Sequence, residues 1–126
     1  MEKALKKKQI VVIEDDPDVT EVLRGLFESS DYEGHFFKSG KEGIPHIEDI
    51  LPDLAIMDLM MPEMSGFDIC QHLKRSVKTR NIPLIAITGY DSRDNRLKIF
   101  AAGIDDYLPK PFDIKTLLKK IKALIS

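Results

Sequence analysis

Short runs of consecutive apolar residues recur along the chain, and none of them alternates with polar residues. The three clearest runs cover residues 10–13, 54–57 and 84–87. Strands of a parallel sheet that are covered on both faces have this pattern, whereas strands with one solvated face alternate. Two weaker runs, residues 35–37 and 107–108, suit strands nearer the edges of the sheet. The pattern therefore predicts a parallel sheet of five strands.

Longer segments with apolar residues at helical spacing separate these runs. Asp16 followed by Pro17 is typical of a helix start, because the carboxylate caps free N–H groups and proline has no N–H to satisfy. The apolar residues expected on the buried side of this first helix are Val19, Val22, Leu23, Leu26 and Phe27.

Three of the remaining helices are marked by capping signals. Ser65 and Asp68 form a capping-box pattern ahead of an apolar stripe at Ile69, Leu73 and Val77. Residues 91–102 predict a fourth helix that Gly103 terminates, and a last helix begins near Asp113.

The second helix, between residues 41 and 50, contains Gly43 and Pro45. Proline inside a helix removes a hydrogen bond and clashes with the preceding turn, so we expect this helix to start late or to kink.

Five strands that alternate with five helices predict an α/β domain: a doubly wound parallel sheet with helices on both faces. The length of 126 residues suits one domain, which we assign to residues 9–126 after a basic tail at residues 1–8. Ligands of such sheets bind at the carboxyl ends of the strands.

Polar residues follow four of the five predicted strands. Glu14 and Asp15 come after the first strand, Asp58 after the third, Thr88 after the fourth, and Lys110 after the fifth. Any one of them alone would be explained as a loop residue or a helix cap. Because the strands are parallel, however, all of these side chains emerge at one edge of the sheet.

Three carboxylates this close together repel one another unless a cation neutralises them. Carboxylate oxygens suit Mg²⁺, and the absence of cysteine and histidine from the group argues against zinc. We expect only surface or packing roles for the three scattered histidines, His35, His46 and His72.

A carboxylate beside Mg²⁺, an ammonium group and a hydroxyl can accept a phosphoryl group and form an aspartyl phosphate. Asp58 is best placed to do so because it ends the central strand, with Glu14 and Asp15 as metal ligands. The spacing alone leaves Asp15 open as the alternative nucleophile.

Composition limits the other functions of the chain. The net charge of -2 gives no general attraction to nucleic acid, and no apolar stretch is long enough to span a bilayer. The basic N-terminal residues lack the apolar segment that is typical of a signal peptide, and a single cysteine, Cys70, excludes an intramolecular disulfide. We expect Cys70 to be buried as a small apolar residue, and the protein to be cytoplasmic.

Four motifs resemble the receiver domain of two-component response regulators. They are Val-Val-Ile-Glu-Asp-Asp at residues 11–16, the segment 52–62 around Asp58, Ile-Thr-Gly at 87–89, and Asp-Tyr-Leu-Pro-Lys-Pro-Phe at 106–112. The resemblance implies a flavodoxin-like sheet with strand order 2-1-3-4-5. It also implies a signalling switch rather than an enzyme.

The resemblance assigns a role to each residue of the site. Asp58 is phosphorylated, and Mg²⁺ is held by Asp15, Asp58 and the main-chain carbonyl of Met60, with Glu14 reaching it through water. Lys110 and Thr88 contact the phosphoryl group, Tyr107 rotates inward behind Thr88, and the Lys110–Pro111 bond is cis. The face formed by helix 4, strand 5 and helix 5 then changes.

The implied upstream partner is a histidine kinase or a histidine phosphotransfer protein. We expect it to dock on the first helix at Asp18, Glu21, Val22 and Gly25. Downstream, the switch would dock onto a target protein or an output domain, or form a homodimer through the helix 4–strand 5–helix 5 face. Charges at Arg96, Asp105, Asp106 and Lys120 could pair in that dimer, although ordinary solvated surface charge explains them better.

Two positions near the site predict a long-lived phosphoryl group. Met60 and Tyr90 lie two residues after Asp58 and Thr88, and neither carries a carboxylate or amide that would orient an attacking water. Met60 also argues against the competing interpretation, an aspartyl-phosphate phosphohydrolase, which places a second carboxylate there. The third interpretation, a binding module without phosphorylation, conflicts with the complete set of site residues. The chain ends one helix after Lys110, which suits a stand-alone receiver or the receiver part of a longer regulator.

Overall fold

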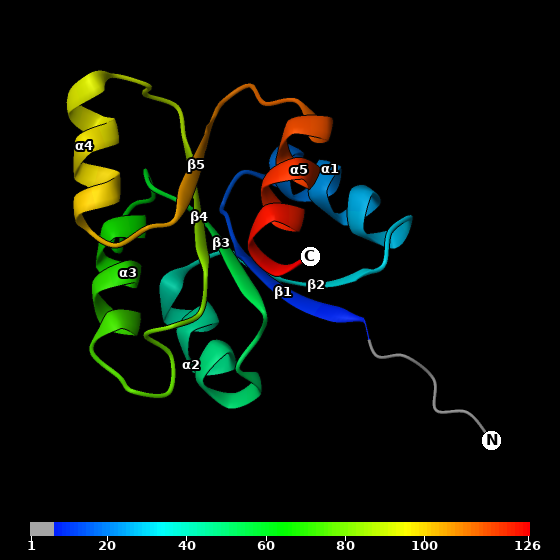
Figure 1. The fold of residues 1–126 in the computed structure, drawn as a ribbon, viewed down its shortest axis with the longest axis horizontal. Helices are drawn as coiled ribbons and strands as arrows, with labels where there is room; N and C mark the ends of the chain where they lie inside the picture. The colour runs from blue at the N-terminus through cyan, green and yellow to red at the C-terminus, as the bar shows by residue number, and fades with distance from the viewer. Residues whose placement is uncertain (1–6) are drawn as a thin grey trace.

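The computed structural model describes residues 7–126, which form a five-stranded sheet between two layers of helices (Figure 1). The sheet order is β2-β1-β3-β4-β5, and all neighbouring strands are parallel. In chain order the elements are β1 Lys8–Ile13, α1 Pro17–Glu28, β2 Tyr32–Phe37, α2 Gly40–Ile50, β3 Leu54–Asp58, α3 Gly66–Lys74, β4 Leu84–Thr88, α4 Arg93–Ala101, β5 Asp106–Pro109 and α5 Ile114–Ile125. The predicted fold class and strand order are confirmed.

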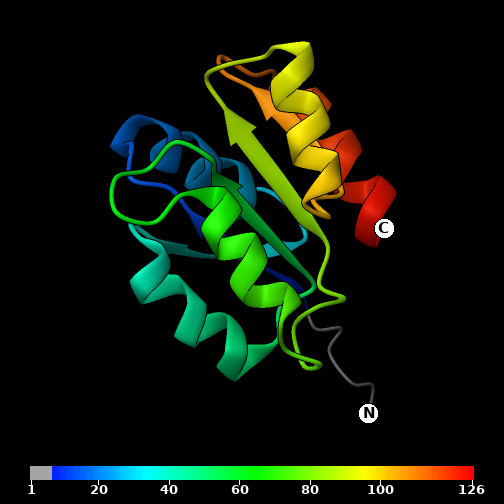
Figure 2. The same cartoon turned by 90° about the vertical axis from the view of Figure 1, so that its left-hand side faces the viewer.

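The two faces of the sheet carry separate apolar cores. Helices α2, α3 and α4 cover one face, and α1 and α5 cover the other (Figure 2). Successive side chains of a strand point to opposite faces, so Val11 and Ile13 join the first core while Ile10 and Val12 join the second. Every residue of β3 and β4 is buried, which explains why these strands show no polar alternation.

The predicted capping signals are confirmed. The Asp16 side chain accepts a hydrogen bond from the Asp18 N–H at 2.9 Å, with Pro17 opening α1. Ser65 and Asp68 form both bonds of a capping box, and Asp113 caps α5. Gly103 ends α4 at a φ of 93°, a conformation that favours glycine.

Two residues predicted to be buried are exposed. Val22 lies 45% exposed because only Leu23 and Phe27 of α1 face fully inward. Val77 is 74% exposed because α3 ends at Lys74. The buried Thr79 hydroxyl donates to the Leu73 carbonyl at 2.6 Å, which satisfies a carbonyl at the helix end and turns the chain away.

The predicted late start of α2 is wrong, and the alternative, a kink at Pro45, stays a prediction. The helix begins at Gly40, capped by the Ser39 side chain, and contains Pro45 in its interior. A Cβ on Gly43 would lie 2.5 Å from the Ile13 side chain, so glycine at this position lets α2 approach β1 closely. Packing against the sheet therefore outweighs the poor helix propensity of these residues.

Of the predicted basic tail, residues 1–6 lie outside the described residues, and Lys8 belongs to β1. No helix within residues 7–126 is long and apolar enough to cross a membrane.

Candidate functional site

Three carboxylates meet where β1 and β3 end. Glu14 and Asp15 follow β1, and Asp58 is the last residue of β3. The pairing of Ile13 with Met57 brings these strand ends side by side, and carboxylate oxygens of the three residues lie within 4.8 Å of one another. Glu14 and Asp58 are buried, while Asp15 is exposed. The predicted convergence at the sheet edge is therefore present.

Both carboxylate oxygens of Asp58 accept a hydrogen bond. The Lys110 ammonium donates to Oδ2 at 3.1 Å, and the Met60 backbone N–H donates to Oδ1 at 2.9 Å. Lys110 comes directly after β5, so its side chain reaches across the end of β4 to Asp58. Lys110 and Met60 thus fix the orientation of the Asp58 carboxylate.

Glu14 is 1% exposed and only partly satisfied. Its Oε2 accepts from the Asp16 N–H at 3.0 Å. Within the described part of the chain no group donates a hydrogen bond to Oε1, although the Lys110 ammonium lies 3.3 Å away. Burial, and then its interaction with Asp58, raises the pKa of Glu14 to about 8.

Two effects act in opposite directions on the pKa of Lys110. Its partial burial disfavours the charged form, but the hydrogen bond to Asp58 and the attraction of Glu14 outweigh this and raise its pKa. The ammonium therefore stays charged between two carboxylates.

The donor set fits a magnesium ion. Three oxygen ligands lie close together, one buried carboxylate oxygen lacks a hydrogen-bond donor, and one lysine leaves the cluster with surplus negative charge. Met60 lies beside these ligands, since its N–H contacts Asp58.

Thr88 is fully buried and its hydroxyl contacts the loop after β4. The Tyr90 N–H donates to Oγ1 at 3.0 Å, and the Asn95 side-chain amide donates to the same atom at 3.2 Å. The Asn95 amide also donates to the Tyr90 carbonyl at 2.7 Å. Asn95 gave no signal in the sequence, because a polar residue in the first turn of a helix is common.

Tyr107 is held by the same segment. Its hydroxyl donates to Asp91 Oδ1 at 3.3 Å, and Arg96 donates to that oxygen at 2.8 Å. The Tyr107 ring meets Phe100 of α4 edge-on, with 6.0 Å between ring centroids. Residues 91–96 thus contact both side chains that the resemblance names as switch residues.

Further predicted features can be located on the structure. The Lys110–Pro111 bond is cis, as the resemblance implies. Met60 and Tyr90 are exposed, at 69% and 67%. Cys70 is buried, as expected, and burial raises the pKa of its thiol.

Charges predicted to pair across a dimer have partners within the chain. Arg96 pairs with Asp91, and Lys120 contacts Asp106 at 3.0 Å. Asp105 accepts a hydrogen bond from the Leu84 N–H at 2.8 Å. A dimer is therefore not required to satisfy them.

Two of the three histidines, which are separated in the sequence, lie side by side in the fold. The rings of His35 and His46 have centroids 5.0 Å apart, whereas His72 lies beside Glu48. The sequence could not reveal this pair, because it forms only when α2 packs on β2.

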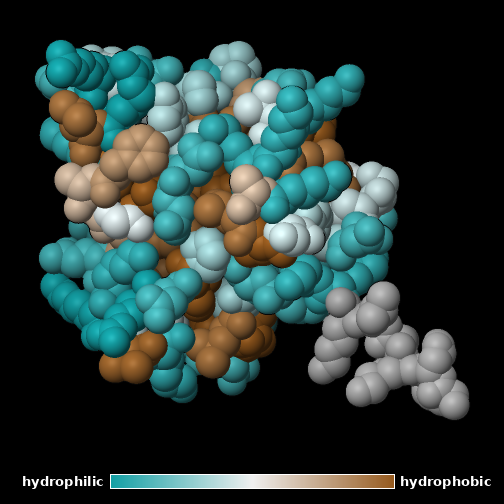
Figure 3. All heavy atoms as spheres, viewed as in Figure 1, coloured by the Kyte–Doolittle hydropathy of each residue, from teal (hydrophilic) through white to brown (hydrophobic). Residues whose placement is uncertain are grey.

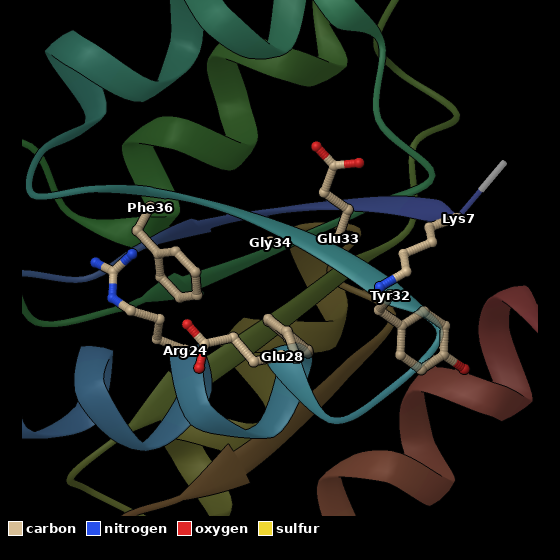
Figure 4. A pocket seen from close by; sticks show the side chains of 8 residues that line it. Lys7, Arg24, Glu28, Tyr32, Glu33, Gly34 and Phe36 are labelled. Atoms are coloured by element: carbon tan, nitrogen blue, oxygen red, sulfur yellow. The ribbon is translucent and has the colours of Figure 1, made fainter.

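A separate pocket lies between α1 and β2 (Figure 4). Arg24 lies over the Phe36 ring there, with its guanidinium carbon 4.6 Å from the ring centroid. The side chains that line the pocket include none of the predicted site residues and carry charges of both signs.

The parallel sheet, the acidic cluster at its carboxyl edge and the adjacent lysine define a phosphoacceptor module of the signalling type. Comparison with known proteins identifies the family: residues 10–122 match the response regulator receiver domain, and the chain belongs to this family. Its members are phosphorylation-activated switches of two-component systems.

Relatives that share this domain include a DNA-binding transcriptional regulator. The chain is 33% identical over 117 residues to the DNA-binding dual master transcriptional regulator RpaA of Synechocystis, covering 93% of the chain and 48% of that protein. It thus spans about half the length of the curated relatives that it matches.

Solved structures of similar fold cover nearly the whole chain. A response regulator structure from Chloroflexus aurantiacus has a TM-score of 0.90 at 28% identity, covering 95% of this chain and 98% of that one. The receiver domain of a sensor histidine kinase from Pseudomonas aeruginosa, with a magnesium ion coordinated in its active-site cleft, has a TM-score of 0.86 at 25% identity. That match covers 94% of this chain and 98% of the other.

Proposed function

We propose that Asp58 accepts the phosphoryl group that activates this receiver domain. The observation that carries this assignment is the hydrogen bond from the Lys110 ammonium to Asp58 Oδ2 at 3.1 Å. Asp15 is exposed, and the raised pKa of Glu14 makes that carboxyl a poor nucleophile at neutral pH. Asp58 is therefore the carboxylate best suited to attack phosphorus.

The transfer forms one bond and breaks another. An Asp58 oxygen bonds to the phosphorus of a phosphohistidine donor while the P–N bond breaks. The imidazole nitrogen leaves with the bonding electrons and takes up a proton from solvent. The Lys110 ammonium stabilises negative charge on the phosphoryl oxygens as the group moves.

We further propose that Glu14, Asp15, Asp58 and the main-chain carbonyl of Met60 hold Mg²⁺, with Glu14 acting through water. The ion supplies positive charge that neutralises the phosphoryl oxygens and the carboxylate cluster. Glu14 has to lose its proton for the site to carry full negative charge.

Intact-mass measurement with a small acyl phosphate donor tests this assignment. With Mg²⁺ present, the native protein should gain one phosphate, and Asp58→Asn should gain none. EDTA should abolish the adduct in the native protein. An adduct that persists in Asp58→Asn would give the acceptor role to another residue.

The proposed switch is a rearrangement of Thr88 and Tyr107. A phosphoryl group adds about two negative charges and three acceptor oxygens. The Thr88 hydroxyl can donate to one of these oxygens only if it gives up its bond to the Tyr90 carbonyl. Tyr107 would then move inward behind it, leaving Asp91.

The output surface that we propose is the α4–β5–α5 face. Leu97 and Phe100 of α4 are 59% and 50% exposed, and apolar atoms interrupt the hydrophilic surface over α4 (Figure 3). Phe100 contacts Tyr107, so movement of the tyrosine alters this surface directly. The face would bind a target protein, an output domain or a second copy of the chain.

Light scattering with and without beryllofluoride, a phosphoryl mimic, distinguishes a dimer from the other two modes. Doubling of the mass on addition of the mimic would support a dimer. A monomer under both conditions would rule the dimer out.

We propose that a histidine kinase or histidine phosphotransfer protein docks on α1. Exposed Val22 and the adjacent Val19 line a pocket with Pro111 and Phe112, next to Lys110. Asp18, Glu21 and Gly25 lie on exposed positions of the same helix. A donor on this surface would present its phosphohistidine directly beside the acidic cluster.

A further inference from the structure

His35 of β2 and His46 of α2 place two ring nitrogens opposite each other. Nδ1 of His35 lies 3.4 Å from Nε2 of His46, and the ring planes meet at 44°. Each histidine lies on a regular element, and both side chains are only partly buried, so the pair is ordered and open to solvent.

The surroundings fix which nitrogen of His35 carries its proton. The Gln9 amide nitrogen donates to Glu33 at 3.0 Å and to the Lys7 carbonyl at 3.4 Å, so the Gln9 amide oxygen faces His35. His35 Nε2 must donate to that oxygen, which leaves Nδ1 as the unprotonated nitrogen of the neutral ring. Most histidines that ligate metals donate the N–H of their other ring nitrogen to an acceptor of this kind.

The separation of the two nitrogens matches one coordination geometry. Two imidazole nitrogens bound tetrahedrally to zinc at ~2.05 Å lie about 3.4 Å apart. Ligands at right angles, as in square-planar or octahedral sites, would lie about 2.9 Å apart at the same bond length. The observed 3.4 Å agrees with the tetrahedral arrangement, and without an ion it is the length of a hydrogen bond between His46 Nε2 and His35 Nδ1.

We propose that His35 and His46 bind Zn²⁺ at a site separate from the acidic cluster at the carboxyl edge of the sheet. His46 would carry its proton on Nδ1, the other neutral tautomer of the ring, and water would complete the coordination. Since His35 belongs to the edge strand and His46 to α2, the ion would fasten this helix to the edge of the sheet. The site does not depend on phosphorylation of Asp58.

Titration with zinc chloride tests the site, with the full chain kept in millimolar Mg²⁺ so that the carboxylates are occupied. Nitrogen NMR of the imidazoles should show the chemical shifts of His35 Nδ1 and His46 Nε2 changing together, with the change complete at one equivalent of Zn²⁺. His35→Gln and His46→Gln should each lower the Zn²⁺ affinity by more than 10-fold, and Gln9→Ala by about 10-fold.

His72→Gln is the matched control, because His72 is a histidine beside a carboxylate, Glu48, 3.3 Å away. It should leave the affinity unchanged, and circular dichroism without zinc should show that every variant is folded. Equal affinity in the native protein and in folded His35→Gln and His46→Gln would overturn the proposal. Failure of the native protein to bind, or an equal loss in His72→Gln, would overturn it as well.

Discussion

Glu14 and Asp58 are both buried carboxylates, yet their surroundings differ. Asp58 accepts hydrogen bonds on both oxygens, whereas one oxygen of Glu14 receives none from the described residues. Asp58 thus has hydrogen-bond donors on both oxygens, whereas the Glu14 carboxyl beside it holds a proton more strongly than usual.

This difference predicts a pH dependence of stability without metal. The pKa of Glu14 is raised from 4.5 to about 8. Between pH 4.5 and about 8, Glu14 is protonated in the folded chain and ionised in the unfolded chain. The stability that this proton contributes is fully present below pH 4.5 and is lost as the pH rises through the folded-state pKa of about 8. Denaturant unfolding in EDTA from pH 5 to 8 should show the unfolding free energy falling by up to ~1.4 kcal/mol per pH unit from this group. Glu14→Gln should remove that slope; parallel curves for the two proteins would contradict the account.

Met60 and Tyr90 predict slow loss of the phosphoryl group. Neither side chain can orient a water molecule toward the aspartyl phosphate, and both are exposed on the loops that follow β3 and β4. The phosphoryl group should be lost at least several-fold faster from Met60→Asn/Tyr90→Glu than from the native protein. The measurement is the disappearance of the phosphate mass over time. Equal decay rates would refute this explanation.

The sequence alone predicted that five residues would lie at one edge of the sheet: Glu14, Asp15, Asp58, Thr88 and Lys110. This was possible because the carboxyl ends of parallel strands meet at the same edge. Spacing could not choose between Asp15 and Asp58 as nucleophile. That choice depends on which carboxylate the lysine reaches, a three-dimensional property.

At the scale of elements, the first turn of α4 and the loop before it form hydrogen bonds with Thr88 and Tyr107, the two proposed switch residues. Asn95 donates to Thr88, and Asp91 accepts from Tyr107. These bonds favour the arrangement described here, and in the proposed switch they would break when Thr88 turns to a phosphoryl group.

Asn95→Ala should therefore favour the activated arrangement. A hydrogen bond contributes about 0.5–1.5 kcal/mol, which corresponds to roughly 2–10-fold in an equilibrium. Beryllofluoride should bind the variant more tightly by this factor in a fluorescence or NMR titration. Asn81→Ala, an exposed asparagine in the α3–β4 loop, is the control and should bind as the native protein does. Unchanged or weaker binding in Asn95→Ala would show that this contact does not restrain Thr88.

Element types and caps were predictable, and several boundaries were not. Unbroken apolar runs and cap residues such as Asp16 and Ser65 are local signals. The glycine and the proline inside α2 are accommodated where Gly43 lets the helix approach Ile13 closely, and a hydrogen bond from Thr79 to Leu73 follows the end of α3. Tertiary contacts of this kind cannot be deduced from residue order.

For the molecule as a whole, stability comes from two cores on opposite faces of one sheet. Ile56 of the central strand is fully buried. Ile56→Ala should lower the unfolding free energy by about 2–5 kcal/mol in a denaturant titration, because it removes buried methyl groups and leaves a cavity. Val77→Ala should change it by no more than about 0.5 kcal/mol, since Val77 is largely exposed. A large loss in Val77→Ala would contradict the end of α3 at Lys74.

The central claim is that one aspartate at the end of β3 carries the signal. Borohydride reduces an aspartyl phosphate in the phosphorylated protein to homoserine. Peptide mass spectrometry then identifies the position of the homoserine in the chain. The account predicts homoserine at position 58 after reaction with a small acyl phosphate and Mg²⁺, and unmodified aspartate at position 15. Homoserine at position 15, with Asp58 intact, would contradict it.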